Sequence, residues 1–435
     1  MSAALSVFRE YQNAYQLVGS LEHQGTTARF RYAQSYLADA SASAISVALP
    51  LRGEAFSHEE THNFFEGLLP EGELRTLIAR TLHLDVRAYA ALLARLNNES
   101  IGALVFSLDG RTPLQNRSYE LFDEERLRDF ARQPLRIAVD ASLTTRLSLA
   151  GAQTKIGLYC HQAEGQDDRW YLPKGLASST HIIKAPSEVF PLQTVNEAFC
   201  LGLARSLGIR TANHFLIALE AAEPLLAIER FDRFYADNAL QIGGLAVPSR
   251  MHQEDFCQAT QLPSYMKYEP TDGNFLNRVA RTLDQEVAKP LEDRLEFFDR
   301  VMLDYLVGNC DNHLKNYSLL RSEDWLTCGL SPHYDVTCTT YYPSLAREMG
   351  ISLCESRRID DVAAANILEA AKRVGIPAAI GKQRYIDLLQ KMPAAIDATS
   401  KSLSSQGFSQ VRVIAQFVKK ELASKVSEDE IVHAS

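Results

Sequence analysis

The first quarter of the chain mixes short strand patterns with helical ones. Residues 15–22 (YQLVGSLE), 28–33 (ARFRYA) and 45–52 (ISVALPLR) are short, partly apolar runs of the kind that form β-strands. Residues 86–96 (VRAYAALLARL) instead place apolar side chains at helical spacing. Together these segments predict a small α+β domain over residues 1–110.

A polar, charged passage follows, and its second half (DEERLRDFARQP) predicts a short helix. We interpret residues 111–144 as a junction between domains. Strand patterns dominate residues 145–250, among them LSLAGAQTKIGLYC, THIIKAP and LLAIERFDR. One helix interrupts them at residues 192–208, where Gly208 suits the C-terminal cap.

Beyond residue 250 the pattern is mostly helical. Residues 295–308 (LEFFDRVMLDYLVG) carry one apolar stripe, and Gly308 stands where that helix should end. A strand-rich segment followed by a helix-rich one predicts an α+β fold with two lobes and a cleft between them. The predicted boundaries give a strand-rich lobe over residues 145–250 and a helical lobe over residues 251–435.

Composition sets only broad limits on function. With 435 residues, 46% hydrophobic and 23% charged, the chain is long enough for two or three domains of ordinary composition. The net charge of −9 argues against binding nucleic acid through the overall field, although it leaves room for a local basic patch. Seven scattered cysteines, an early polar N-terminus and no apolar run of about 18 residues predict a cytoplasmic protein without a membrane segment.

The segment GNCDNHLKNYSLL, residues 308–320, carries the strongest candidate chemistry. Asp311 and Asn316 are spaced as D-x-x-x-x-N between a predicted helix and a predicted strand, and a further strand pattern (LSPHYDVT) ends at Asp335. Phosphoryl transfer needs one carboxylate to orient or deprotonate the acceptor hydroxyl, and an amide and a second carboxylate to hold Mg²⁺. Lys315 could neutralise the transferring group. A solvated Asx-rich turn is the alternative for the isolated motif.

Upstream segments offer phosphate and base contacts. Lys184, at the end of the strand pattern THIIKAP, could reach nucleotide phosphates, with Glu197 of the next helix as ion-pair partner. Gly151 in RLSLAGAQTKIGL would let backbone amides approach phosphates, and IERFDR could bind adenine through its backbone beside Phe231. A solvent-facing edge lysine, a hairpin turn and an ordinary strand end are the respective alternatives.

Residues 58–62 (HEETH) match the H-E-x-x-H pattern of zinc proteases. Ser57 and Glu60 also form an S-x-x-E capping box, which places His58 in the exposed first turn of a helix. Since no clear third ligand follows downstream, we interpret this segment as a capped helix and not as a zinc site.

In their order along the chain, these segments resemble the HipA family of serine/threonine kinases, the toxin half of bacterial toxin–antitoxin modules. The resemblance covers nearly the whole chain, and the ordered set is specific where a single motif is not. In the N-terminal region it rests on VGSLEHQG, FRYAQSYL, ISVALPLR, FFEGLLPEGELR and IGALVFS. In the remainder it rests on LSLAGAQTKIGL, LPKG, THIIKAP, NEAFCLGLARSLG, IERFDR, HQEDFCQATQLP, KYE, GNCDNHLKNYSLL and SPHYDVT.

The resemblance implies a small N-terminal domain on a two-lobed, kinase-like core, in which the strand-rich lobe binds nucleotide and the helical lobe is catalytic. It implies Asp311 as the catalytic residue, Asn316 and Asp335 as Mg²⁺ ligands, and Ser148 as the autophosphorylation site. The ATP contacts that it implies are Ala150, Gly151, Ala152, Gln153, Thr154, Lys155, Lys184, Glu229, Arg230, Phe231, His313, Lys315 and Tyr334. The family pattern GAQEK reads GAQTK here, and LNNES replaces a polar-glycine turn; neither departure removes a catalytic group.

The function implied by the resemblance is an ATP- and Mg²⁺-dependent protein serine/threonine kinase toxin. A helix-turn-helix antitoxin would restrain it, and operator DNA would be reached only through that antitoxin. The implied substrate is an aminoacyl-tRNA synthetase, with glutamyl-tRNA synthetase favoured, whose phosphorylation arrests translation and growth. Two alternatives remain: a small-molecule phosphotransferase, which would not need Ser148, and a catalytically weak kinase-fold corepressor acting with an antitoxin on DNA.

Overall fold

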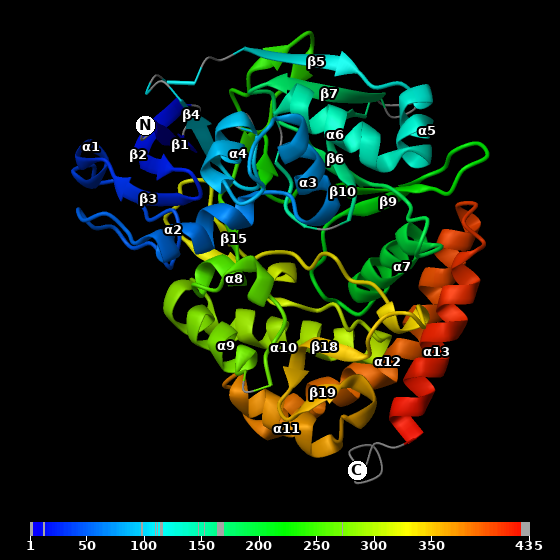
Figure 1. Cartoon of the computed structure of the whole chain (residues 1–435). Coiled ribbons are helices and arrows are strands. Elements are labelled where there is room, and N and C mark those ends of the chain that lie inside the picture. The colour runs from blue at the N-terminus through cyan, green and yellow to red at the C-terminus, as the bar shows by residue number, and fades with distance from the viewer. Residues whose placement is uncertain are drawn as a thin grey trace. The chain divides into compact units, whose positions relative to one another are not determined.

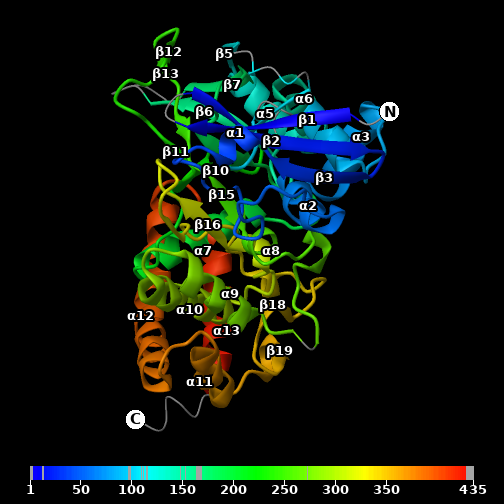
Figure 2. The ribbon, with the colours of Figure 1, turned by 90° about the vertical axis from the view of Figure 1, so that its left-hand side faces the viewer.

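The computed structural model describes residues 3–11, 14–96, 99–108, 110, 112–113, 116–146, 148–151, 153–162, 169–271 and 273–427 (Figures 1 and 2). The chain forms two compact units of three segments each. Unit 1 comprises Met1–Ala185, Ile217–Ser264 and Leu319–Cys328, and unit 2 comprises Pro186–Leu216, Tyr265–Ser318 and Gly329–Ser435. Helices and strands occur in both units, so the predicted α+β class is confirmed. No helix among these residues is long and apolar enough to cross a membrane.

A four-stranded antiparallel sheet begins unit 1 (Figure 2). Alternate residues of its third strand are buried, so that Ala28, Phe30 and Tyr32 face the core, where the Phe30 and Phe65 rings lie 5.3 Å apart. The strands, in the order β3-β2-β1-β4, are β1 (Ala3–Tyr11), β2 (Ala14–Gln24), β3 (Thr27–Tyr32) and β4 (Leu104–Ser107). The helices of this region are α1 (Gln34–Leu37), α2 (His58–Phe65), α3 (Gly72–Thr81) and α4 (Tyr89–Arg95).

Two of the three strands predicted in this region are confirmed as β2 and β3, but the strand predicted at residues 45–52 is wrong. That segment turns back on itself, and the Leu49 N–H donates to the Ser46 carbonyl at 3.1 Å. The Tyr32 hydroxyl holds the turn, because it accepts from the Ile45 N–H at 3.0 Å and donates to the Leu49 carbonyl at 2.6 Å. The apolar pattern therefore reflects burial of Ile45 and Leu49 in a turn, not a strand.

The HEETH segment forms α2, and its predicted capping box is confirmed. The Ser57 hydroxyl accepts from the Glu60 N–H at 3.1 Å, and the Glu60 carboxylate accepts from the Ser57 N–H at 2.7 Å. The capping box therefore accounts for the polar residues Ser57 and Glu60 at the start of this helix.

A second antiparallel sheet carries the middle of unit 1 (Figure 1). Within the unit its order is β5 (Arg117–Leu121), β7 (Arg169–Gly175), β6 (Lys155–His161), β8 (His181–Lys184) and β10 (Leu225–Glu229). The helix predicted near residue 125 is confirmed as α5 (Glu124–Arg132), which packs on α6 (Pro134–Thr145), and α6 contacts β6 and β7. The shorter elements are β11 (Arg233–Phe234), β12 (Gln241–Ile242), β13 (Leu245–Ala246), β14 (Ser249–Arg250), β15 (Gln253–Asp255), α8 (Phe256–Ala259), β16 (Ser318–Arg321) and β17 (Cys328–Leu330).

Unit 2 is mostly helical, as the pattern beyond residue 250 predicts. The helices predicted at residues 192–208 and 295–308 are confirmed as α7 (Gln193–Ser206) and α10 (Pro290–Val307). Gly208 and Gly308 have φ angles of +87° and +82°, the left-handed conformation that glycine adopts at helix C-termini. The other elements are β9 (His214–Ile217), α9 (Phe275–Glu286), β18 (Glu348–Leu353), β19 (Ser356–Arg358), α11 (Ala364–Arg373), α12 (Ala378–Ser405) and α13 (Val411–Ser427).

The strand predicted to end at Asp335 is wrong. β17 ends at Leu330, and in the segment after it His333 forms an isolated bridge with Thr211. Pro332 has no N–H to donate to a neighbouring strand. Asp335 has a φ angle of +55°, which no extended strand permits. The residue predicted to bind metal therefore lies on a loop.

Candidate active site

The loop that follows α10 fixes the backbone of Asp311. The Asp311 N–H donates to Asn309 Oδ1 at 3.1 Å, and the Asp311 carbonyl accepts from Asn316 Nδ2 at 2.7 Å. Asn316 ends the short 3₁₀ helix η3 (Leu314–Asn316) and is buried. The Asp311 side chain is 51% exposed. The structure therefore brings the predicted catalytic residue and one predicted Mg²⁺ ligand together, with the Asp311 carboxylate at the surface.

A buried carboxylate that the sequence analysis missed holds both ends of this loop. Asp304, on the last turn of α10, is fully buried. Its Oδ1 accepts from Asn309 Nδ2 at 2.8 Å, and its Oδ2 accepts from the Tyr317 hydroxyl at 2.5 Å. Burial and the Asp304 charge both raise the pKa of the Tyr317 phenol, which keeps it a donor. Asp304 thus reaches Asp311 through Asn309 on one side of the loop, and on the other side it fixes Tyr317, the residue after Asn316.

The remaining predicted residues of unit 2 also lie at this loop. The Tyr334 hydroxyl donates to the Lys315 carbonyl at 2.9 Å, which ties the residue before Asp335 to the catalytic loop. His313 and Lys315 are both buried. Asp335 adopts the left-handed backbone conformation, which Asp tolerates better than most residues and which is frequent at functional sites. Asp311, His313, Lys315, Asn316, Tyr334 and Asp335 are therefore one local set.

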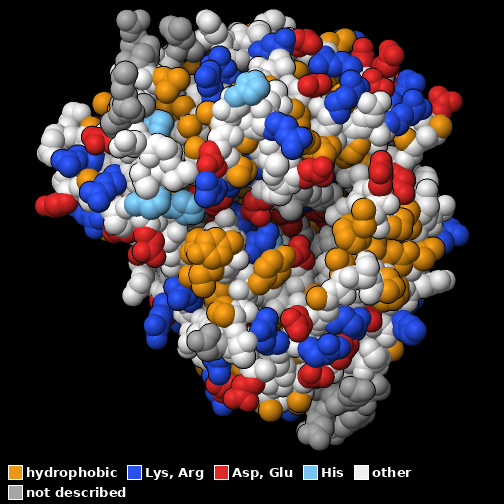
Figure 3. Space-filling view, viewed as in Figure 1, with side chains coloured by type: hydrophobic (Ala, Val, Ile, Leu, Met, Phe, Trp, Pro, Cys, Tyr) orange, Lys and Arg blue, Asp and Glu red, His pale blue; other side chains and the backbone are white. Residues whose placement is uncertain are grey.

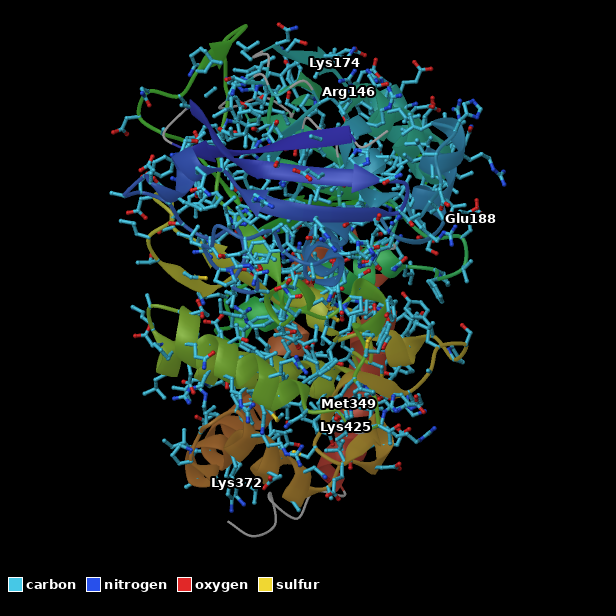
Figure 4. The ribbon with its side chains drawn as sticks, turned by 60° about the vertical axis from the view of Figure 1, so that its left-hand side comes forward. Arg146, Lys174, Glu188, Met349, Lys372 and Lys425 are labelled. Atoms are coloured by element: carbon cyan, nitrogen blue, oxygen red, sulfur yellow. The ribbon has the colours of Figure 1, made fainter. Side chains whose placement is uncertain are left out.

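Lys425 of α13, labelled in Figure 4, caps the helix that leads into the loop. Its ammonium donates to the Tyr305 carbonyl at 2.5 Å and lies 3.7 Å from the Glu421 carboxylate. The Tyr305 carbonyl belongs to the last turn of α10, where it also accepts from the N–H of the C-cap residue Gly308 at 3.2 Å. Burial lowers the pKa of the Lys425 ammonium to about 8.

We expect the free energy of unfolding of the wild type to rise, relative to that of Lys425→Met, between pH 8 and pH 10.5, since burial lowers this pKa from 10.5 to about 8. In that window the unfolded chain still holds a proton that the folded chain has released, so stability increases with pH. Below pH 8 both states are protonated and the slope vanishes. Denaturant unfolding on both sides of this window measures the effect, with Lys401→Met, an exposed lysine of α12, as the control. A constant difference between wild type and Lys425→Met would contradict the lowered pKa.

In unit 1 the two predicted phosphate-binding lysines lie directly opposite each other on neighbouring strands. Lys155 begins β6 and Lys184 ends β8; the register pairs them, and both are buried. Gly151 has a φ of +104°, and a Cβ added there would lie 2.7 Å from Lys155 Nζ, so the ammonium rests against the loop backbone. Opposed like charges are destabilising on a sheet. Two lysines side by side are a suitable pair for binding the negative charge of a phosphate group.

The predicted phosphate loop is held by the N-terminal region of the same unit. Ser148 is fully buried; its N–H donates to the Glu99 carbonyl at 2.8 Å and its hydroxyl donates to the Leu68 carbonyl. The Glu71 N–H donates to the Gly151 carbonyl at 3.3 Å. Further along, the loop is bound to the end of β8: the Ala185 N–H donates to the Thr154 carbonyl at 3.2 Å, and Gln153 Nε2 donates to the Ala185 carbonyl at 3.4 Å. Ala150, earlier in the loop, is half-buried. Ala152 lies outside the described residues.

The predicted adenine segment has one exposed, one buried and one half-buried residue: Glu229, Arg230 and Phe231. The Arg230 guanidinium donates to Asp232 at 2.8 and 2.9 Å and to Glu99 at 3.2 Å. Burial alone would raise the pKa of Asp232, but the arginines beside it hold that pKa well below its usual range. The Arg230 N–H donates to the Thr180 carbonyl at 2.8 Å. The Arg230 side chain therefore anchors this segment, and a nucleotide base would meet other backbone groups of it.

The predicted site residues thus fall into two sets, one in each unit. Glu197 is buried in α7 of unit 2, whereas Lys184 belongs to unit 1, and their ion pair stays a prediction.

Comparison with known proteins relates the chain to a family. Residues 12–107 match the HipA N-terminal domain, and residues 147–399, more than half of the chain, match the HipA-like C-terminal domain. The chain belongs to the HipA family.

Relatives within the HipA family align over most of their length. Y4mE of Sinorhizobium fredii is 31% identical over 381 residues, which cover 84% of this chain and 85% of Y4mE. The serine/threonine-protein kinase toxin HipA of Shewanella oneidensis is 24% identical, over 91% of this chain and 90% of that one. In the solved complex of HipA, HipB and operator DNA from Shewanella oneidensis MR-1, a chain matches with a TM-score of 0.78 at 21% identity, covering 97% of this chain and 96% of that chain. That likeness establishes the fold.

Proposed function

We propose that this HipA-family chain is an ATP- and Mg²⁺-dependent protein serine/threonine kinase. The observation that carries the proposal is the loop in which Asp304 fixes Asn309 and Tyr317 on either side of Asp311 and Asn316. A rigid loop with an exposed carboxylate is what orients an acceptor hydroxyl for phosphoryl transfer. The relative from Shewanella oneidensis, named as a serine/threonine-protein kinase toxin, supports the same class of chemistry.

The oxygen donors of Asn316 and Asp335 fit Mg²⁺, a hard cation that prefers oxygen ligands. Asn316 uses its Nδ2 to bind the Asp311 carbonyl, which leaves its amide oxygen as the atom suited to the metal. When bound, Mg²⁺ would neutralise charge on the nucleotide phosphates. Lys155 and Lys184 would bind those phosphates electrostatically beside the loop at Gly151, and Asp311 would orient the acceptor hydroxyl and take up its proton.

We further propose that the chain is the toxin of a toxin–antitoxin module in the cytoplasm. We keep the predicted domain boundaries at residues 110, 144 and 250 as part of this proposal. A helix-turn-helix antitoxin like HipB would be its partner, because the structurally similar chain was solved with HipB and operator DNA. An aminoacyl-tRNA synthetase, with glutamyl-tRNA synthetase first, is the proposed protein substrate. Phosphoproteomics of cells that express the chain with and without its antitoxin tests this choice, and phosphate on a small molecule alone would favour the phosphotransferase alternative.

Autophosphorylation on Ser148 should open the loop that now buries it. Ser148 is fully buried against Leu68 and Glu99, a position that a phosphate dianion cannot keep without unpaired, desolvated charge. After incubation with ATP and Mg²⁺, we expect phosphate on Ser148 and cleavage by trypsin after exposed Arg146 at least about ten-fold faster, because cleavage follows the opened population. Phosphopeptide mapping and timed proteolysis measure both. Ser148→Ala is the control, and phosphorylated protein with unchanged cleavage would contradict the prediction.

A further inference from the structure

The carboxylate of Asp311 has a neighbour that the proposed chemistry does not use. Tyr268 donates its hydroxyl to Asp311 Oδ1 at 2.5 Å, and its ring meets the His313 imidazole edge to face, with centroids 5.1 Å apart. The Tyr268 side chain is 47% exposed. The contact therefore lies at the surface, where an acceptor protein can reach both residues.

The backbone on each side of Tyr268 is fixed. The Lys267 carbonyl accepts from the Leu314 N–H at 3.2 Å, which ties this segment to the catalytic loop. Glu269 is buried, and its carboxylate accepts from the Phe275 N–H at 2.7 Å. Since the chain is held at both neighbours, rotation of the Tyr268 side chain is the movement that takes the hydroxyl away from the carboxylate.

We propose that Tyr268 is a gate on the acceptor site: its hydroxyl occupies the place on Asp311 that the acceptor serine or threonine hydroxyl must take. This inference rests on the proposed kinase function. A catalytic base binds the hydroxyl that it activates at hydrogen-bond distance, about 2.6–3.2 Å, and a phenol O–H is the same kind of donor. While Tyr268 is bound, it keeps water from the same oxygen, and hydrolysis of ATP without an acceptor is slowed.

Apolar surface beside the gate offers an acceptor protein the means to open it. Tyr265 and Met266, in the same segment, are 79% and 38% exposed. Figure 3 shows that one face of the molecule carries hydrophobic side chains gathered in patches among the charged ones. Contact of a protein with this segment would offset the loss of the hydrogen bond between Tyr268 and Asp311, whereas water makes no such contact. The gate therefore favours protein acceptors over water.

The variant Tyr268→Phe tests the gate, because it keeps the ring against His313 and removes only the hydroxyl. In the full chain we expect its ATP hydrolysis without acceptor to rise about five-fold. For a synthetic peptide that carries Ser148 and its neighbours, KM should fall by a similar factor while kcat stays within about two-fold. Tyr171→Phe removes the hydroxyl of a half-buried tyrosine on β7, outside both sets of predicted site residues, and should behave as the wild type in both assays.

Three results would overturn the gate: unchanged ATP hydrolysis in Tyr268→Phe, a folded but inactive Tyr268→Phe, or phosphate on Tyr268 itself. The second would make the hydroxyl a support for Asp311, and the third would make it an acceptor. A different result tests the function beneath the inference. If the wild type and Asp311→Asn hydrolyse ATP at the same rate, the kinase proposal fails, and the gate fails with it.

Discussion

Asp311→Asn should lower the rate of phosphoryl transfer by about 10³-fold while leaving ATP affinity within about two-fold. The amide has the shape of the carboxylate but cannot take up the acceptor proton. The loop should keep its conformation, because Asn309 and Asn316 bind the main chain of residue 311 and not its side chain. Initial rates of transfer from radiolabelled ATP, with calorimetric titration of ATP in the presence of Mg²⁺, separate chemistry from binding.

Asp324→Asn is the matched control for this substitution. Asp324 is exposed, and its carboxylate accepts from the Ser322 hydroxyl and the Leu326 N–H within one turn, away from the catalytic loop in sequence. Its phosphoryl-transfer rate should equal that of the wild type. Equal rates in the wild type and Asp311→Asn would show that Asp311 is not the catalytic residue. A wild type that binds ATP with Mg²⁺ but transfers no phosphate would favour the corepressor alternative.

Features set by local chemistry could be predicted from the sequence. Gly208 and Gly308 mark the ends of α7 and α10, because the left-handed conformation at a helix C-terminus is a property of the residue itself. Ser57 and Glu60 begin α2 for an equally local reason. The order of Asp311, Asn316 and Asp335 in the chain predicted that they act together. The hydrogen bond from the Tyr334 hydroxyl to the Lys315 carbonyl joins the segment that carries Asp335 to the loop that carries the other two.

Features that depend on contacts between distant residues could not. The turn at residues 45–52 follows from the hydroxyl of Tyr32, and a strand pattern contains no trace of that contact. Tyr268 and Asp311 are 43 positions apart, so their hydrogen bond is invisible in the sequence. The sequence does contain one indication of the role of Asp304, because a carboxylate lies here on the last, largely apolar turn of a helix. Such a residue is rarely buried without partners, and its partners prove to be the two ends of the catalytic loop.

Asp304→Ala should lower the free energy of unfolding by about 3–5 kcal/mol, because it leaves two buried donors, Asn309 Nδ2 and the Tyr317 hydroxyl, without their acceptor. Asp304→Asn should cost about 1–2 kcal/mol, since its oxygen can still accept from Asn309 while its amide donates to the Tyr317 oxygen. Both variants are compared by denaturant unfolding. If Asp304→Ala were as stable as Asp304→Asn, the loop would not depend on this carboxylate.

The same pair of variants should separate the positioning role of Asp304 from simple stabilisation. Under conditions where each variant is folded, we expect Asp304→Asn to lower kcat about ten-fold with little change in KM for ATP. The neutral amide at position 304 still accepts from Asn309, but it holds Asn309, and through it Asp311, less firmly than the carboxylate does. Asp299→Asn is the control on the same helix. Its carboxylate pairs with Arg384, with Nε 2.8 Å from Oδ1, and has no bond to the catalytic loop among those described. A similar loss of stability in Asp299→Asn with an unchanged kcat would show that the effect of Asp304 on catalysis passes through the loop, whereas equal losses of kcat in both variants would contradict that role.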